Sequence, residues 1–497
     1  MFDEPKSLAV QARTRFASLP NRRRVFDFAT SGLLSAAILD LLGKHNTVTG
    51  DEQQSLSTVG STRTHFPPSA RRVIHICLIG GFSQVDTFDY KPELERLHGK
   101  SIPGQAQPNT FFGSAGLLAK PYWTFRQRGQ SGLWMSDLFP HLAEVADQLT
   151  IIRSMVADTA NHTPAYLQQM TGFQANGFPS MGSWISYGLG NETDSLPTFV
   201  VLPDARSLPN GGASNWASGF LPAEHQGVLL RGGSEPIRDL FPRQRISPET
   251  ELASSNLLAQ LNGIHLADRK ENDLLKARVQ AFELAARMQI SIPESVDFRN
   301  ETQQTLGLYG IGAEPTNDCG QRCLLARRLL ERGVRYVQLF SGGCFGGSPR
   351  HGWDSHEDCF KDHEREAAMI DKPIAGLLSD LQQRGMLDDT LVLFTTEFGR
   401  TPFANAPAGT MGLGRDHNPE GFSVWMAGGG TRSGTAYGET DEIGWKSVEN
   451  KVTWPDLHAT VLHLLGLNHK SLTFYHNGIQ RRLTNVHGNV VQQLITK

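Results

Sequence analysis

This chain has few cysteines and little net charge. Its 497 residues include only five cysteines, and so sparse and odd a set excludes a disulfide framework. Cys319 and Cys323 are four residues apart on an expected helix, but no second pair is arranged to complete a zinc site. The 47 basic and 50 acidic residues leave a formal net charge of -3. That balance gives no electrostatic reason to expect nucleic acid or an acidic membrane surface as a partner.

The N-terminal region contains a pattern typical of export. The run Arg22–Phe26 contains an R-R-x-F sequence that begins at Arg23, and the mostly apolar run Gly32–Leu42 follows it. A basic region before so short an apolar run favours a signal over a membrane span, and the paired arginines indicate the twin-arginine route. An amphipathic first helix is the alternative, favoured by two aspartates in this region. We expect residues 1–45 to be the signal and 46–68 a polar linker, and the protein to be periplasmic with no membrane span after signal removal.

Six nearly continuous apolar runs indicate the strands of a mostly parallel sheet buried on both faces. Helical patterns at Cys323–Arg332 and Glu364–Arg384 lead directly into two of them, which favours an α/β fold with helices on both faces of the sheet. In such sheets ligands bind at the carboxyl ends of the strands. The runs are Val73–Ile79, Leu149–Ile152, Thr198–Leu202, Val334–Phe340, Leu391–Thr396 and Phe422–Ala427.

The strand–helix alternation is interrupted once. Residues 204–317 begin with a Gly/Asn-rich loop and end in an expected long helix, Asn272–Met288. We interpret this stretch as an inserted cap that covers one edge of the sheet. The core is then formed by residues 69–203 and 318–497.

Residues typical of metal ligands follow several of the expected strands. Asp86 comes after the first, Asp354 and His356 after the fourth, Glu397 at the end of the fifth, and His417 on a glycine-rich loop before the sixth. Carboxylate and imidazole groups together are typical of Zn, Mn or Fe sites. A helix cap or turn is the alternative role for the aspartates. A carboxylate at the tip of a buried strand, as Glu397 is, needs a cation or hydrogen bonds to satisfy it.

Two arginines accompany these residues. Arg400 follows Glu397 closely and could either form a salt bridge or bind an anionic substrate in bidentate fashion. Arg415 lies two residues before His417 and could bind an anion or simply be solvated. The sequence leaves both alternatives open.

The order of these groups resembles the alkaline phosphatase superfamily, which includes sulfatases, phosphodiesterases and cofactor-independent phosphoglycerate mutases. His162–Gly172 is similar to the sulfatase nucleophile turn C/S-x-P-S-R-x-x-L-x-T-G, with Pro164, Thr171 and Gly172 in register. His162 stands where the nucleophile would be, which excludes the formylglycine mechanism of sulfatases. Phe398 replaces an expected histidine ligand, and Glu397 replaces an aspartate.

More narrowly, the chain resembles the DUF1501 family of exported bacterial proteins over roughly residues 70–490. This resemblance implies a three-layer αβα sandwich like that of alkaline phosphatase, with an inserted cap. The segments that carry it are Gly80–Asp89, Leu97–Lys100, Arg153–Met155, Asn161–His162, Asn215–Pro222, Trp353–His356, Thr395–Pro402 and Asp416–Pro419.

We therefore predict an exported metal-dependent hydrolase of phosphate esters, in preference to sulfate esters, acting on a small-molecule or carbohydrate ester. One or two divalent cations (Zn, Mn or Ca) would activate a water molecule. His162 could be a ligand, a general base or a covalent acceptor, and Arg400 and Arg415 would neutralise the substrate anion. The alternative is a catalytically inactive, metal-containing binding protein of the same fold. The predicted ligands are Asp86, Asp354, His356, Glu397 and His417.

Overall fold

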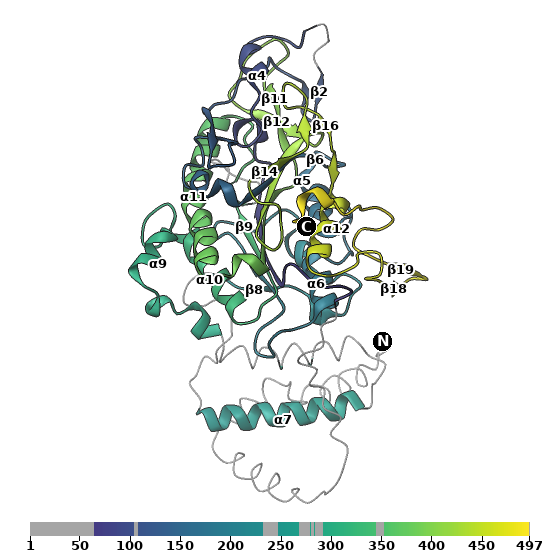
Figure 1. Cartoon of the computed structure of the whole chain (residues 1–497). Helices are drawn as coiled ribbons and strands as arrows, with labels where there is room; N and C mark the ends of the chain where they lie inside the picture. Colours follow the sequence, from purple (N-terminus) through teal and green to yellow (C-terminus); the bar gives the residue numbers. More distant parts are fainter. Residues whose placement is uncertain are drawn as a thin grey trace, which may run out of the picture. The chain divides into compact units, whose positions relative to one another are not determined.

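Figure 1 shows the computed structural model of the chain. It describes residues 64–103, 108–231, 247–267, 279, 283, 292–343 and 352–496. The chain divides into two units, Met1–Thr58 and Val59–Lys497, and the described residues all belong to the second. The predicted signal, most of the predicted linker and nearly all of the predicted helix Asn272–Met288 lie outside the described residues. Within the described ranges, no helix is both long and apolar enough to cross a membrane.

All six runs predicted as strands belong to one nine-stranded sheet, whose order is β14-β6-β13-β10-β1-β9-β7-β8, with β17 also paired to β6. Strand β13 is antiparallel to both of its neighbours, and every other pairing is parallel. The prediction of a mostly parallel sheet is therefore confirmed. The strands are β1 (Arg72–Leu78), β6 (Leu149–Val156), β7 (Phe199–Leu202), β8 (Val228–Leu229), β9 (Tyr336–Ser341), β10 (Thr390–Thr396), β13 (Phe422–Ala427), β14 (Thr435–Tyr437) and β17 (Val452–Thr453).

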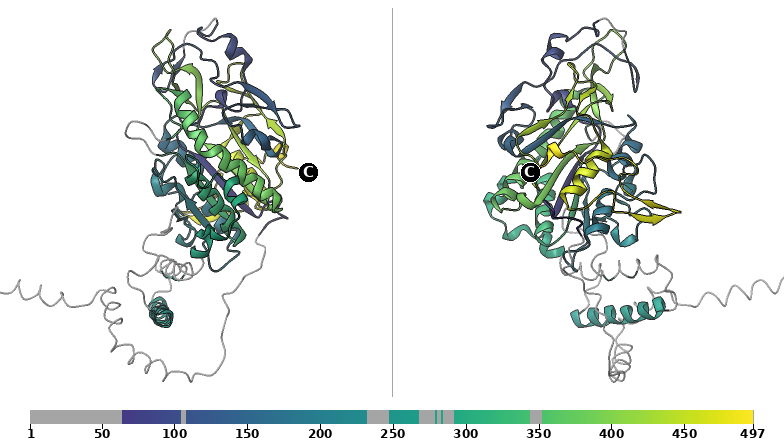
Figure 2. Two further views of the ribbon diagram at one scale, coloured as in Figure 1. Left: turned by 90° about the vertical axis from the view of Figure 1, so that its left-hand side faces the viewer. Right: turned by 45° about the vertical axis from the view of Figure 1, so that its right-hand side comes forward.

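Helices cover both faces of this sheet. On β1, Ile74 and Ile76 point into the cluster that contains helices α10 (Asn317–Glu331) and α11 (Cys359–Gln383). Val73 and Cys77 point into the opposite cluster, with α5 (His162–Thr171), α6 (Met181–Leu189) and α12 (Trp454–Leu464). Because successive strand residues face opposite sides, this alternation establishes a three-layer αβα sandwich. Figure 1 shows the two helical layers on either side of the strands, and Figure 2 brings α11 (green) and α12 (yellow) forward in turn.

The sandwich carries several smaller elements. Two of the hairpins, β2–β3 and β11–β12, matter for the site. The remaining helices and strands of the described residues are α4 (Pro92–Arg96), α7 (Pro248–Ala267), α9 (Gln303–Leu308), β2 (Asn109–Thr110), β3 (Gly113–Ser114), β4 (Phe125–Arg128), β5 (Leu133–Ser136), β11 (Gly399–Ala404), β12 (Arg415–Asn418), β15 (Glu439–Thr440), β16 (Ser447–Glu449), β18 (Phe474–His476) and β19 (Ile479–Arg481). Short 3-10 helices span Gln84–Asp86, Leu142–Gln148, Gly212–Trp216, Ala223–His225, Phe298–Asn300, Leu387–Asp389 and Gln492–Leu494.

The described part of the predicted cap, residues 204–317, includes a strand of the central sheet. Strand β8 pairs with β7 and forms one edge of that sheet. Trp216 is buried against Phe340 of β9, with ring centroids 6.0 Å apart. Both residues belong to the core of the sandwich. A role for this region in substrate access stays a prediction.

Candidate metal centre and active site

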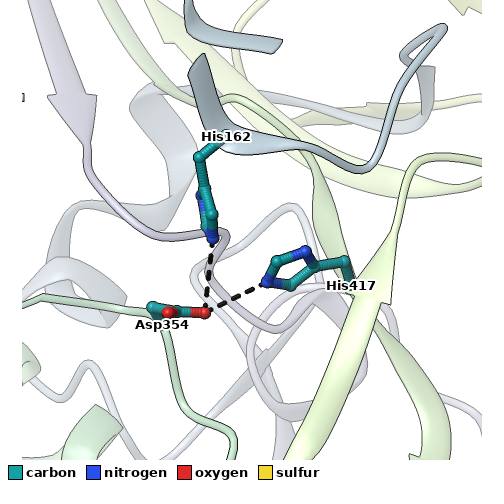
Figure 3. Close-up of side chains that lie close together, drawn as sticks. All are labelled: His162, Asp354 and His417. Carbon is teal, nitrogen blue, oxygen red and sulfur yellow. Dashed lines mark hydrogen bonds and ion pairs between the residues drawn. The ribbon is translucent and has the colours of Figure 1, made fainter. Parts of the chain in front are cut away.

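Four segments that are distant in sequence meet at the carboxyl edge of the sheet. His162 is the first residue of α5, six residues after β6 ends, and Glu397 directly follows β10. Asp354 lies between β9 and α11, and His417 lies on β12, which pairs with β11. Figure 3 shows His162 and His417 pointing at the Asp354 carboxylate from different elements.

The centre of the cluster is one oxygen atom, Oδ1 of Asp354. The Nε2 atoms of His162, His356 and His417 lie 3.4, 2.7 and 3.1 Å from it. Nη2 of Arg400 lies 2.6 Å from the same oxygen. One ligand atom each from His162, Asp354 and His417 can be chosen so that all three lie within 4.8 Å of one another. All of these side chains are buried.

The outward-facing nitrogens of two histidines indicate which ring atoms carry hydrogen. Nδ1 of His417 is 2.7 Å from the carbonyl oxygen of Ala160, and Nδ1 of His162 is 2.7 Å from Oε1 of Glu397. A carbonyl or a carboxylate can only accept, so Nδ1 donates in both rings. In their neutral forms the two rings therefore present the Nε2 lone pair toward Asp354. Metal-ligating histidines are usually oriented in this way, by a carboxylate or carbonyl that binds the other nitrogen.

The charges in the cluster differ strongly between the groups. Burial opposes ionisation of Asp354, but the positive charge of Arg400 and the contacts with the three histidine rings outweigh it and hold the pKa of that carboxyl well below its usual range. Burial, together with the charges of Arg400 and His162, holds the pKa of His417 well below 6.5. Burial also opposes the charged form of His162, but Asp354 and Glu397 outweigh it and raise its pKa.

This arrangement fits a divalent cation. With His417 neutral, its Nε2 lone pair lies 3.1 Å from an ionised carboxylate oxygen of Asp354 and 3.0 Å from Nε2 of His356. Ligand atoms that share one zinc-sized ion at about 2.1 Å lie roughly 3 to 3.5 Å apart. The separations of His162 and His417 from Asp354 agree with that spacing. Imidazole and carboxylate donors together suit zinc or manganese better than calcium, which prefers oxygen ligands.

His356 faces the cluster differently. Its Nδ1 lies 3.3 Å from the amide nitrogen of Asn405, which also donates to the His356 carbonyl oxygen at 3.1 Å. An amide nitrogen can only donate, so Nδ1 accepts and Nε2 carries the hydrogen. In this structure His356 therefore donates toward Asp354, a role different from that of a ligand.

The structure places Asp86 in a separate buried ion pair with Arg415, not in the His–Asp cluster. Nε of Arg415 is 2.7 Å from Oδ2 of Asp86, and both side chains are fully buried. Ser83 Oγ donates to Oδ2, and the backbone N–H of Tyr122 donates to Oδ1 at 2.9 Å. The acceptor positions of Asp86 are thus occupied by the protein itself.

Both predicted anion-binding arginines donate to protein groups. Arg400 donates from Nε to the Gly81 carbonyl oxygen at 2.7 Å, from Nη1 to that of Arg415 at 3.0 Å, and from Nη2 to Gly80 and Asp354. Arg415 donates to Asp86 and to backbone carbonyls that include Thr401. In this structure their guanidinium groups therefore brace the loops around the site.

Sequence reasoning missed the aromatic and polar residues at the rim. Phe111 and Phe112, at the tip of the β2–β3 hairpin, lie over the histidines, with the Phe111 ring stacked on His417 at 5.0 Å. Asn405 contacts His356, and Asp416 accepts from the backbone of Phe112 at 2.8 Å. The one feature of the sequence that could have indicated this rim is the pair of adjacent phenylalanines in a polar, glycine-containing stretch.

The fold and the cluster together define an αβα protein with a buried His–Asp site at the carboxyl edge of its sheet. The family model described as "Protein of unknown function (DUF1501)" matches residues 70–495, so the chain belongs to this family. No curated protein matches the chain.

Several solved structures are similar to this chain at low identity. The lipoteichoic acid synthase LtaP from Listeria monocytogenes is 12% identical, with 90% of this chain and 81% of that chain covered and a TM-score of 0.35. The PsFucS1 sulfatase from Pseudoalteromonas sp. is 13% identical, with 80% and 68% covered and a TM-score of 0.32. A TAB5 alkaline phosphatase mutant with bound Mg is 9% identical, with 81% and 99% covered and a TM-score of 0.33.

Proposed function

We propose that this protein is a metal-dependent hydrolase of phosphate or sulfate esters, with phosphate preferred. His162, Asp354 and His417 would hold one divalent cation, zinc or manganese. The observation that carries this proposal is the convergence of two imidazole Nε2 atoms, which bear the lone pair in the neutral rings, on the ionised oxygen of Asp354. When bound, such a cation supplies a Lewis acid that polarises an ester oxygen and lowers the pKa of water toward about 7.

His162 acts in this proposal as a ligand. Its Nε2 faces Asp354 at 3.4 Å and its Nδ1 is held by Glu397. A covalent acceptor would need Nε2 to face the substrate instead. His162 also opens helix α5. The N-terminus of a helix carries about half a positive charge, which favours an anionic ester group beside it.

Arg400 acts as a positioning residue. It joins Asp354 to the carbonyl groups of Gly80 and Gly81, which follow β1. The same contact gives Asp354 a compensating positive charge, so the carboxylate stays ionised and able to bind a cation. His356 donates to Asp354 from another side and holds its orientation.

The alternative is a metal-containing binding protein without catalysis. Arg400 and Arg415 were predicted to bind the substrate anion, but their guanidinium groups donate to protein oxygen atoms instead. This arrangement favours the binding protein. Both proposals require the metal, and they differ in turnover.

Metal content is therefore measured first, by mass spectrometry on purified wild type and on His417→Ala and Asp354→Ala. His476→Ala, on the β18–β19 hairpin, is the control for losing a histidine. We expect about one equivalent of zinc or manganese in wild type and in the control, and its loss in both site variants. Folded wild-type protein that takes up neither metal would overturn the proposal.

Turnover is then measured on the loaded protein with aryl and alkyl phosphate and sulfate monoesters. Hydrolysis that disappears in His417→Ala and persists in His476→Ala supports the enzyme. A loaded protein that hydrolyses none of these esters supports the binding protein.

We further propose that the protein is exported and that residues 1–45 direct this. The paired arginines of the R-R-x-F sequence, Arg23 and Arg24, support the proposal. Replacing both with lysine is expected to retain the protein in the cytoplasm, whereas Arg13→Lys should not. An unchanged distribution between cell fractions would remove the twin-arginine assignment.

A further inference from the structure

A hairpin tip presents two exposed aromatic side chains beside the histidines. Phe111 and Phe112 connect β2 to β3, and they are 46% and 64% exposed. The Phe112 ring lies 4.7 Å from that of His356 and 5.6 Å from that of His417. Two adjacent exposed aromatic rings form a small apolar patch, and apolar patches with a polar rim are a feature of ligand-binding grooves.

Next to this hairpin lies a cavity of about 340 Å³. Its apolar wall includes Phe112 and Phe403, and its polar groups include Thr401, Asn405 and Asp416. A volume above about 300 Å³ is in the range of small-molecule sites, and the lining of this cavity is more polar than apolar.

The cavity adjoins the His–Asp cluster through shared residues. The Asn405 side chain donates to the carbonyl oxygen of His356 at 3.1 Å. Asp416 accepts from the backbone N–H of His417 at 2.7 Å, and from that of Phe112 at 2.8 Å. A ligand in the cavity would therefore lie beside the cluster.

The charge of the lining decides which part of a ligand fits. Among the described residues, the lining of this cavity includes one carboxylate, Asp416, and neither lysine nor arginine. A sulfate or phosphate group placed there would face like charge, which is unfavourable in a partly enclosed site. A neutral ring with hydroxyl groups fits better, because its C–H face can pack on Phe112 while its hydroxyls donate to Asp416.

We propose that this cavity binds a neutral sugar ring, the alcohol part of a carbohydrate ester whose anionic group lies at the His–Asp cluster. This inference rests on the proposed function for the position of the ester. It assigns Phe112 and Asp416 the role of selecting the alcohol, which is separate from holding the metal.

The test measures binding of neutral sugars alone, so that it does not depend on turnover. Metal-loaded protein is titrated with methyl glucoside, maltose, cellobiose and lactose, and binding is followed by saturation-transfer NMR. Phe112→Ala is compared with wild type, with the conservative Phe112→Trp, and with Tyr475→Ala, which removes a 65% exposed aromatic residue on β18.

We expect at least one sugar to receive saturation on its ring C–H protons in wild type, in Phe112→Trp and in Tyr475→Ala. Its Kd should rise at least tenfold in Phe112→Ala, with metal content unchanged. No transfer to any of the four sugars, or equal binding in Phe112→Ala, would overturn the inference. Sugar binding that survives in metal-free His417→Ala would show that the cavity is a sugar site even if the proposed hydrolase fails.

Discussion

Glu397 is the carboxylate that orients His162. It is fully buried, accepts from Nδ1 of His162 at 2.7 Å, and also accepts from the backbone N–H of Gly80 at 3.1 Å. Glu397→Gln keeps the shape but offers a neutral group to that ring. We expect metal affinity to fall about 10- to 100-fold, as for other residues that hold a ligating histidine. Competition with a chelating dye measures this. Glu420→Gln, which changes a surface pair with Lys446, is the control and should leave the Kd unchanged.

Asp86 was predicted from the sequence to be a metal ligand, and a substitution can test whether it is one. In the structure it pairs with Arg415, and neither side chain is exposed. Asp86→Asn leaves the guanidinium buried without its counter-charge, so we expect unfolding to become easier by about 3 kcal/mol. The metal should be retained at about one equivalent. Asp389→Asn, in a partly exposed pair with Arg72, should cost less than about 1 kcal/mol in denaturant unfolding. Loss of the metal in folded Asp86→Asn would return Asp86 to the ligand set.

At the scale of elements, the segment after β1 packs tightly against the segment that carries Asp354. Gly80 has φ +122°, and a Cβ there would lie 2.3 Å from the backbone nitrogen of Asp354. Gly80→Ala must therefore displace Asp354, and we expect metal content to fall well below one equivalent. Gly99→Ala is the matched control, since Gly99 also has a positive φ but an added Cβ would meet no atom within 4 Å. Equal metal content in the two variants would mean that the site tolerates this displacement.

The strands of the central sheet could be predicted from the sequence, whereas the direction of one strand and the short hairpins could not. All six long apolar runs are strands, because burial on both faces leaves a strong pattern. The antiparallel direction of β13 was not foreseen, since one strand's pattern does not encode its neighbour's direction. The β2–β3 hairpin has two-residue strands, too short to show any period. The partners of Arg400 and Arg415 were equally hidden, because Asp86 and Arg415 lie 329 positions apart and no local pattern joins them.

For the whole molecule, the response of stability to pH should differ with and without metal, and His162 is the reason. Its folded pKa is raised above 6.5 in the metal-free protein. The protonated ring therefore stabilises the metal-free fold below about pH 6.5, and this contribution is lost as the pH rises through the raised value. Metal binding needs the unprotonated nitrogen, so affinity falls about tenfold for each pH unit below that pKa. These are two descriptions of one linkage, so the stabilisation by metal, which is the stability of loaded protein minus that of chelated protein, should increase with pH.

The size of this effect follows from binding linkage. Metal at 100 times its Kd stabilises the folded state by about 2.7 kcal/mol, and a tenfold weaker Kd at the same concentration reduces that to about 1.4 kcal/mol. Thermal unfolding of wild type with zinc or with a chelator, at pH values from about 6 to 8 around the reference pKa of 6.5, measures the difference. His476→Ala should follow the wild-type trend, and His417→Ala should show almost no difference at any pH. A wild-type difference that stays constant with pH would mean that no histidine releases a proton when the metal binds, and His162 would then leave the ligand set.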